Sequence, residues 1–159
     1  TVSIWFQSVW FLAVIGQNHT HFLLALAVAA TLIWSFFDEA KMHWVWLVVF
    51  SVLGMGMDTL NSALGIFKFD NDTLPLWLAL LWVIFVWYAY QMRAVLIRFP
   101  ILLVSIIGAV GAAGSYFAGW KLGAVQWPNG IGVTFGLVTM QWWILFALMI
   151  VSLKRLQQR

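Results

Sequence analysis

The stretch ILLVSIIGAVGAAGSYFA, residues 101–118, contains no charged side chain and only three polar ones. A helix that crosses the hydrocarbon core of a bilayer needs about 20 mainly apolar residues, with a range of about 17–25. The whole chain has the same character, because 64% of its residues are hydrophobic and only 8% are charged. So few charges cannot cover a water-facing surface, since soluble domains are about a quarter charged. The sequence therefore predicts that lipid is the solvent for most of the chain.

Five more apolar runs accompany this one, and short polar loops separate them. They are Val2–Gly16, His21–Phe37, Trp44–Phe67, Leu74–Gln91 and Ile131–Leu153. The predicted fold is an all-α membrane protein, a compact bundle of six transmembrane helices that forms one domain over residues 1–159. The first run is short, so an arrangement of five spans with that run lying on the membrane surface is the alternative. No convincing repeat relates the two halves of the chain.

The basic residues predict the orientation, because cytoplasmic loops carry an excess of Lys and Arg. With six spans, one side of the membrane holds six basic residues and the other holds only Lys68 and Lys121. The six are Lys41, Arg93, Arg98, Lys154, Arg155 and Arg159. We therefore expect both termini to lie in the cytoplasm. The absence of cysteine excludes disulfides and thiolate metal sites.

Asp58 is the most informative polar residue, because it lies near the middle of the third apolar run. A charged group inside the membrane costs roughly 2.5–3.5 kcal/mol on insertion scales and is a functional candidate by default. Asn61 and Ser62 follow three and four residues later and share its helix face, with Gly54 and Gly65 on nearly the same stripe. This stripe predicts either the wall of a pocket with a proton-active group or an interhelical hydrogen bond that fixes packing.

Other polar side chains within or near the runs are candidates for the same pocket, namely Gln7, Gln91, Gln141 and Tyr116. For each glutamine taken alone, a hydrogen bond between two helices is the favoured interpretation, and Tyr116 is either a pocket hydroxyl or an anchor at the membrane interface. Arg93 and Arg98 are candidates for binding lipid headgroups. His19 and His21 are two residues apart and do not share a helix face, and His43 follows at the far end of the next run. We therefore predict no metal site, and nothing in the sequence indicates a cofactor.

Small residues at helical spacing predict close contact between helices. They are Gly108, Gly111, Ala112, Ser115 and Gly119 in the fifth run, and Gly132 and Gly136 in the sixth. Four tryptophans lie inside the runs and not at their ends, which predicts roles in helix packing or in a pocket wall; they are Trp82, Trp87, Trp142 and Trp143. The segment Asn71–Thr73 matches a glycosylation sequon, and the acidic cluster around it is too short for a calcium loop.

Three stretches resemble one family. They are GMGMDTLNSALGIFKF (Gly54–Phe69), LPLWLALLWVIF (Leu74–Phe85) and GSYFAGWKLGAV (Gly114–Val125). Together they resemble a small bacterial inner-membrane family, domain of unknown function family 2878, over nearly the whole chain. The resemblance implies a Gram-negative inner membrane and a role beside lipid-modifying enzymes such as those resembling cyclopropane-fatty-acid synthases. It implies no catalytic residues, and the VWYAYQM segment after Phe85 departs from the polar stretch that is usual there.

Three classes of function remain open. The first is a role in membrane lipid or fatty-acid modification, as an accessory, sensor or lipid-binding component. The second is a small transporter or channel in which Asp58 is the proton or cation site, and the third is a structural or assembly subunit of a membrane complex. An enzyme is less well supported, because a lone carboxylate lacks a nucleophile and a second acid–base group. The expected partners are membrane lipids, a second copy of the chain or a lipid-modifying enzyme, and not nucleic acid.

Overall fold

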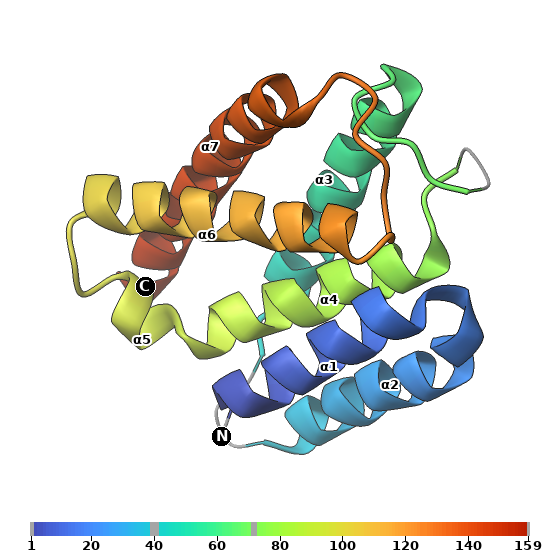
Figure 1. Cartoon of the computed structure of the whole chain (residues 1–159). Coiled ribbons are helices and arrows are strands. Elements are labelled where there is room, and N and C mark those ends of the chain that lie inside the picture. The colour runs from blue at the N-terminus through green and yellow to red at the C-terminus, as the bar shows by residue number, and fades with distance from the viewer. Residues whose placement is uncertain (1, 39–41, 71–72, 159) are drawn as a thin grey trace.

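The computed structural model describes residues 2–38, 42–70 and 73–158, and this part of the chain is almost entirely helical (Figure 1). The helices are α1 (Val2–Gly16), α2 (His21–Phe37), α3 (Trp44–Ala63), α4 (Leu76–Gln91), α5 (Arg93–Leu96), α6 (Ile101–Lys121) and α7 (Ile131–Gln157), with a 3₁₀ turn η1 (Gln17–Thr20) between the first two. The described residues contain no β-strand, only one antiparallel bridge between Lys68 and Gln126. The predicted all-α class is confirmed.

Within the described residues, four segments are long and apolar enough to cross a membrane: Val2–Phe37, α3, α6 and α7. The first of these folds back on itself at η1, so that α1 and α2 form a hairpin (Figure 1). Its arms have 15 and 17 residues, and α4 has 16. At 1.5 Å per residue these three helices rise about 22–26 Å, somewhat less than a hydrocarbon core of about 30 Å. The chain is a membrane protein, and among its apolar helices α1, α2 and α4 are shorter than α3, α6 and α7.

The hairpin turn depends on Gly16 and Thr20. Gln17 adopts a positive φ of 47°, and the Thr20 hydroxyl donates a hydrogen bond of 3.2 Å to the carbonyl of Leu12. A Cβ at Gly16 would lie 1.9 Å from Thr20 Oγ1, so only glycine leaves room for this contact. The hairpin packs against α4, which also packs against α3, while α6 and α7 form a second closely packed pair (Figure 1).

Among the described residues, four tryptophans satisfy the indole N–H in the same way; Trp46 and Trp87 are buried, whereas Trp5 and Trp143 are partly exposed. Each of four indoles donates to a Ser or Thr hydroxyl on another helix, and that hydroxyl donates to a backbone carbonyl of its own helix. The pairs are Trp5–Thr31 (2.8 Å), Trp46–Ser152 (2.7 Å), Trp87–Ser35 (2.7 Å) and Trp143–Ser105 (3.1 Å). Buried indoles need such partners because lipid offers none. The predicted packing role of Trp87 and Trp143 is confirmed.

α3 and α6 end in the same structure. Gly65 and Gly123 have φ values of 75° and 80°, and in each case the following N–H bonds the carbonyl five residues earlier at 2.9 Å. This is the Schellman cap, which requires a left-handed residue that glycine adopts without strain. Three residues after each glycine, Lys68 and Gln126 exchange two backbone hydrogen bonds of 3.0 and 2.9 Å.

The two caps belong to a short sequence repeat that hydropathy alone does not reveal. It reads LGIFKF over residues 64–69 and LGAVQW over residues 122–127. Seven residues before the glycine, one copy carries Asp58 and the other carries Tyr116. Because the two loops are joined at the Lys68–Gln126 bridge, the repeat sets the ends of α3 and α6 side by side.

Candidate functional site

Asp58 joins three helices in the interior. Its side chain is fully buried, and its Oδ2 atom accepts two hydrogen bonds, one of 2.7 Å from Trp82 Nε1 on α4 and one of 2.5 Å from the Tyr116 hydroxyl on α6. Its Oδ1 atom has no hydrogen-bond partner among the described residues. The Schellman cap ends α3 at Ala63, so Asp58 lies about 7.5 Å from the end of the helix and not near the middle of the span.

Gly54 makes room for the indole that reaches Asp58. A Cβ on Gly54 would lie 2.2 Å from Trp82 Cε3, a distance at which side-chain and ring atoms overlap. The Trp82 ring therefore crosses α3 at Gly54 and places its N–H at the carboxyl group one turn later. Only a residue without a side chain allows α3 and α4 to approach in this way.

Asn61 and Gln141 form a second polar contact one turn further along α3. Asn61 Nδ2 donates to Gln141 Oε1 at 2.8 Å, and Gln141 Nε2 donates to Asn61 Oδ1 at 2.7 Å. This reciprocal amide pair connects α3 to α7. The donor and the acceptor of each side chain are paired with those of the other. In the structure, Asn61 and Gln141 therefore hold two helices together beside Asp58.

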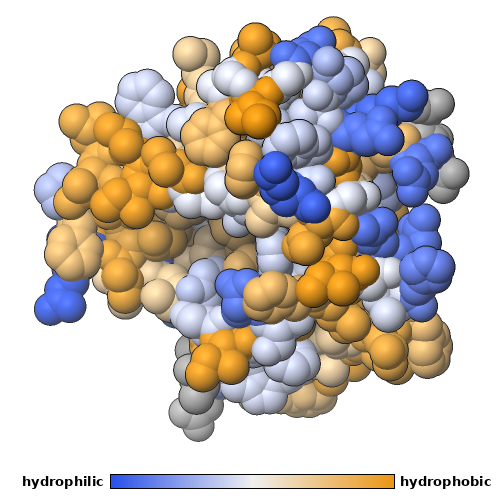
Figure 2. Space-filling view, in the orientation of Figure 1, coloured by the Kyte–Doolittle hydropathy of each residue, from blue (hydrophilic) through white to orange (hydrophobic). Residues whose placement is uncertain are grey.

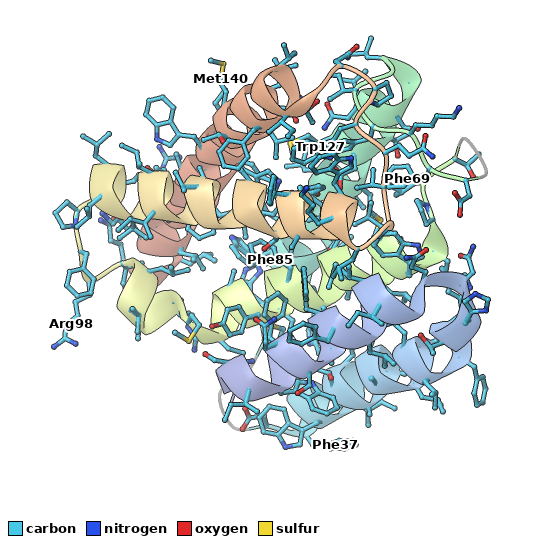
Figure 3. The ribbon with its side chains drawn as sticks, viewed as in Figure 1. Phe37, Phe69, Phe85, Arg98, Trp127 and Met140 are labelled. Atoms are coloured by element: carbon cyan, nitrogen blue, oxygen red, sulfur yellow. The ribbon has the colours of Figure 1, made fainter. Side chains whose placement is uncertain are left out.

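The remaining predicted residues lie elsewhere. The Ser62 side chain is half-buried and makes no hydrogen bond among the described residues, and Gln7 is exposed on α1. Gln91 Nε2 is buried at the other end of α4 and has no hydrogen-bond partner in the part of the chain that the structure describes. Arg93 donates to the carbonyl of Tyr90 at 2.9 Å and stacks over that ring, whereas Arg98 points away from the helices (Figure 3). Residues 39–41 and 71–72, which include Lys41 and part of the sequon, lie outside the described residues.

An apolar cavity of about 250 Å³ lies in front of Asp58, between α1, α4, α6 and α7. Trp82 and Tyr116, the two residues that bond the carboxyl group, form part of its wall. Figure 3 shows Phe85 in the space between α4 and α6, and Figure 2 shows the surface hollowed there. Phe69 and Val125, from the two bridged loops, line the same cavity. Asp58 itself does not line the cavity, because Trp82 and Tyr116 lie between its carboxyl group and the cavity.

The small residues of α6 form one wall of this cavity; they are Gly108, Gly111, Ala112, Ser115 and Gly119. A Cβ on Gly111 would meet no atom within 4 Å, so the absence of a side chain there keeps space open. Gly108 has a packing role, since its Cβ would lie 2.7 Å from the Phe146 ring on α7. The predicted contact between these two helices is confirmed. A Cβ added at Gly132 or Gly136 would meet no atom within 4 Å, so the close approach does not require glycine at either position.

Aromatic rings supply most of the other walls. The indoles of Trp82 and Trp142 stack with their ring centroids 4.8 Å apart and an interplanar angle of 9°, and Phe85 packs edge-on against both. Both tryptophans therefore take the predicted role in a pocket wall. No Lys, Arg or His lines the cavity in the part of the chain that the structure describes.

The fold and the site define a helical membrane protein whose interior holds an apolar cavity backed by a buried carboxyl–phenol pair. The chain belongs to the family described as Protein of unknown function (DUF2878), whose sequence model matches residues 1–148. The resemblance in the three quoted stretches is thereby confirmed. Searches of the curated proteins and of the solved structures give no match to this chain.

Proposed function

We propose that the protein binds a lipid in the α1/α4/α6/α7 cavity and takes part in membrane lipid or fatty-acid modification as a lipid-binding, sensing or accessory component. The cavity carries this proposal, because its shape and chemistry fit an acyl chain. It follows α6 from Gly108 to Gly119, a rise of about 16 Å, and its walls are almost wholly apolar. An elongated apolar space parallel to membrane helices matches the direction in which lipid chains lie.

The cavity also has a side on which a lipid can enter. α1 and α6 both line it, yet within the described residues these two helices do not pack closely on each other. Gly111 and Ser115, on the cavity side of α6, are exposed at the surface of the protein. Because such a surface faces hydrocarbon in a membrane, the gap between α1 and α6 supplies a route from the bilayer.

The carboxyl group supports a function beyond packing. Elsewhere in the bundle four indoles are satisfied by Ser or Thr hydroxyls, which are neutral and cheap to bury. Trp82 is instead satisfied by Asp58, which is far more costly to place in a membrane. A hydroxyl would suffice for the indole alone, so we infer that the carboxyl group serves the cavity that Trp82 and Tyr116 line.

The test is a lipid profile of strains that carry different versions of the gene. We expect deletion to change a defined acyl or headgroup species, and Gly111→Phe and Asp58→Asn to reproduce the change. Gly111→Phe fills the cavity, whereas Gly114→Phe on an exposed face of the same helix is the matched control and should restore the parent profile. Untargeted lipid mass spectrometry is the measurement, with expression of each variant checked in the membrane fraction.

An unchanged profile in the deletion strain would remove the support for lipid modification. The second candidate, a small transporter that uses Asp58 as its proton or cation site, would then be preferred. The Oδ1 atom favours it, since it is buried, has no hydrogen-bond partner among the described residues and keeps a lone pair that can take a proton. Proton and ion flux into liposomes that contain the parent or the Asp58→Asn protein would then decide.

We place the protein in a bacterial inner membrane with six crossings and both termini in the cytoplasm. Supporting this, α5 packs beside α7, so that Arg93 and Arg98 lie at the same end as Lys154 and Arg155. Lys68 and Lys121 lie at the opposite end, near the bridged loops. This separation follows the positive-inside rule.

The lack of cysteine makes this topology measurable with single-cysteine variants. We expect an impermeant thiol reagent applied to intact cells or spheroplasts to label Asn18→Cys in η1. It should not label Ser3→Cys at the start of α1 until the membrane is opened. If the reagent reaches Ser3→Cys from outside, the first run lies on the outer surface and the five-span arrangement is correct.

A further inference from the structure

We propose that the lipid held in the cavity ends in a hydroxyl group, so that the site selects a neutral long-chain alcohol over a fatty acid or a phosphate-headed lipid. This inference rests on the proposed lipid binding and adds the chemistry of the polar end. It follows from the directions of the hydrogen bonds around Tyr116 and from the polar groups that remain unused.

The first observation is that the proton of Tyr116 is already engaged. The phenol donates it to Asp58 Oδ2, and the indole N–H of Trp82 is donated to the same atom. A phenol has one proton, so Tyr116 keeps only acceptor lone pairs for a molecule in the cavity. Ser115, the other hydroxyl that lines the cavity, donates its proton to the carbonyl of Gly111 at 3.2 Å and is likewise left as an acceptor.

The second observation is an unused donor next to Tyr116. Trp142 lines the cavity and is only 4% exposed, and its Nε1–H has no hydrogen-bond partner among the described residues. Its ring centroid lies 6.2 Å from that of Tyr116. The Trp142 nitrogen is sealed within the wall, so an occupant reaches it only where the neighbouring rings shift. A buried indole N–H normally has a partner, and an acceptor on the occupant would then supply it.

A hydroxyl is the simplest group that completes both residues, since it donates one hydrogen bond and accepts others. It donates to the Tyr116 oxygen and accepts from Trp142. A carboxylate or phosphate only accepts, so it would bring its lone pairs against those of Tyr116 and Ser115. Among the described residues, no cation lines the cavity to offset such a charge. A fatty acid would therefore have to enter in its protonated form, which costs additional free energy at neutral pH.

The test compares two photoreactive probes of equal chain length, a diazirine-bearing long-chain primary alcohol and the matching carboxylic acid. Each is added to the purified full-length protein in detergent micelles, and covalent labelling is mapped by peptide mass spectrometry. We expect the alcohol to label the cavity helices about tenfold more than the acid does, which corresponds to one lost hydrogen bond to a buried group. Unlabelled alcohol should compete with the probe.

Variants connect the preference to the two residues. Tyr116→Phe and Trp142→Phe keep an aromatic ring in place and remove one hydrogen-bonding group each, so both should reduce alcohol labelling towards the level of the acid. Tyr88→Phe is the matched control, because Tyr88 bonds Ser3 outside the cavity at 2.7 Å. It should leave the labelling unchanged. Thermal unfolding of each variant shows whether it is folded. If one of the two test variants does not fold, the other still tests the preference.

The outcomes separate this inference from the proposal it rests on. If neither probe labels the cavity, lipid binding itself is contradicted. If both probes label it equally, or the acid labels it more, the protein binds lipid but the preference for a hydroxyl is wrong. Equal loss of labelling in Tyr88→Phe would also overturn the assignment, because it would show that the effect does not arise at Tyr116.

Discussion

Asp58→Ala is expected to destabilise the protein more than any other single truncation of a polar side chain. The change removes the acceptor of two buried donors at once, the indole of Trp82 and the phenol of Tyr116. A buried donor that loses its partner costs about 1–3 kcal/mol, so the two together cost about 2–6 kcal/mol. The measurement is thermal unfolding of the purified protein in detergent, followed by the change in tryptophan fluorescence.

Two further variants calibrate this prediction. Asp58→Asn keeps an acceptor oxygen at the same position, and we expect it to lose only about 1–2 kcal/mol. Ser35→Ala removes the acceptor of a single buried indole, that of Trp87, and should cost about 1–3 kcal/mol. If Asp58→Ala is no more harmful than Ser35→Ala, the two hydrogen bonds of the carboxyl group contribute little to stability.

Gly54→Ala and Gly56→Ala are expected to change stability in opposite directions, although they lie two residues apart on one helix. At Gly54 the added methyl group overlaps the Trp82 ring, which must move and give up its bond to Asp58. Overpacking of this kind costs about 1–3 kcal/mol, and the lost hydrogen bond adds about 1 kcal/mol. At Gly56 no atom lies within 4 Å, and alanine is the better helix former by up to about 1 kcal/mol.

Thermal unfolding of both variants measures the difference, and near-UV circular dichroism reports whether the stacked pair Trp82–Trp142 is kept. We expect the near-UV signal to change in Gly54→Ala only. An unaltered spectrum and a melting temperature equal to that of Gly56→Ala would show that α3 and α4 separate easily, and that the close approach at Gly54 is not required.

The sequence alone determined the class of fold and the positions of most helices. The apolar runs Val2–Gly16 and His21–Phe37 were predicted with the bounds that α1 and α2 have. This succeeds because in lipid each segment must satisfy its own backbone hydrogen bonds, which makes a long apolar run a helix whatever its neighbours are. Asp58 was also recognised from the sequence, since a carboxyl group among apolar residues is costly wherever the helix is placed.

The local end of a helix was harder to predict. The apolar pattern predicts a third run that reaches Phe67, but α3 ends at Ala63 because Gly65 adopts a left-handed conformation and closes a Schellman cap. The residues after the cap, Ile66 and Phe67, are apolar and buried against the bundle, so hydropathy does not distinguish them from helix. The same Leu-Gly pair recurs at Leu122–Gly123. The repeat LGIFKF/LGAVQW is therefore the sequence pattern that indicates where α3 and α6 end.

Only the tertiary structure decided which polar residues meet. Asn61 and Ser62 have nearly the same spacing from Asp58, yet the Asn61 amide bonds Gln141 on α7 and the Ser62 hydroxyl makes no hydrogen bond among the described residues. Likewise, nothing in the spacing shows that Tyr116 and Trp82 share one oxygen of Asp58, or that the small residues of α6 border a cavity. Periodicity in the sequence shows which residues share one face of a helix, but not which neighbouring helix that face meets. The rotation of each helix about its axis is set by side-chain packing, because lipid-facing and buried residues of this chain are equally apolar.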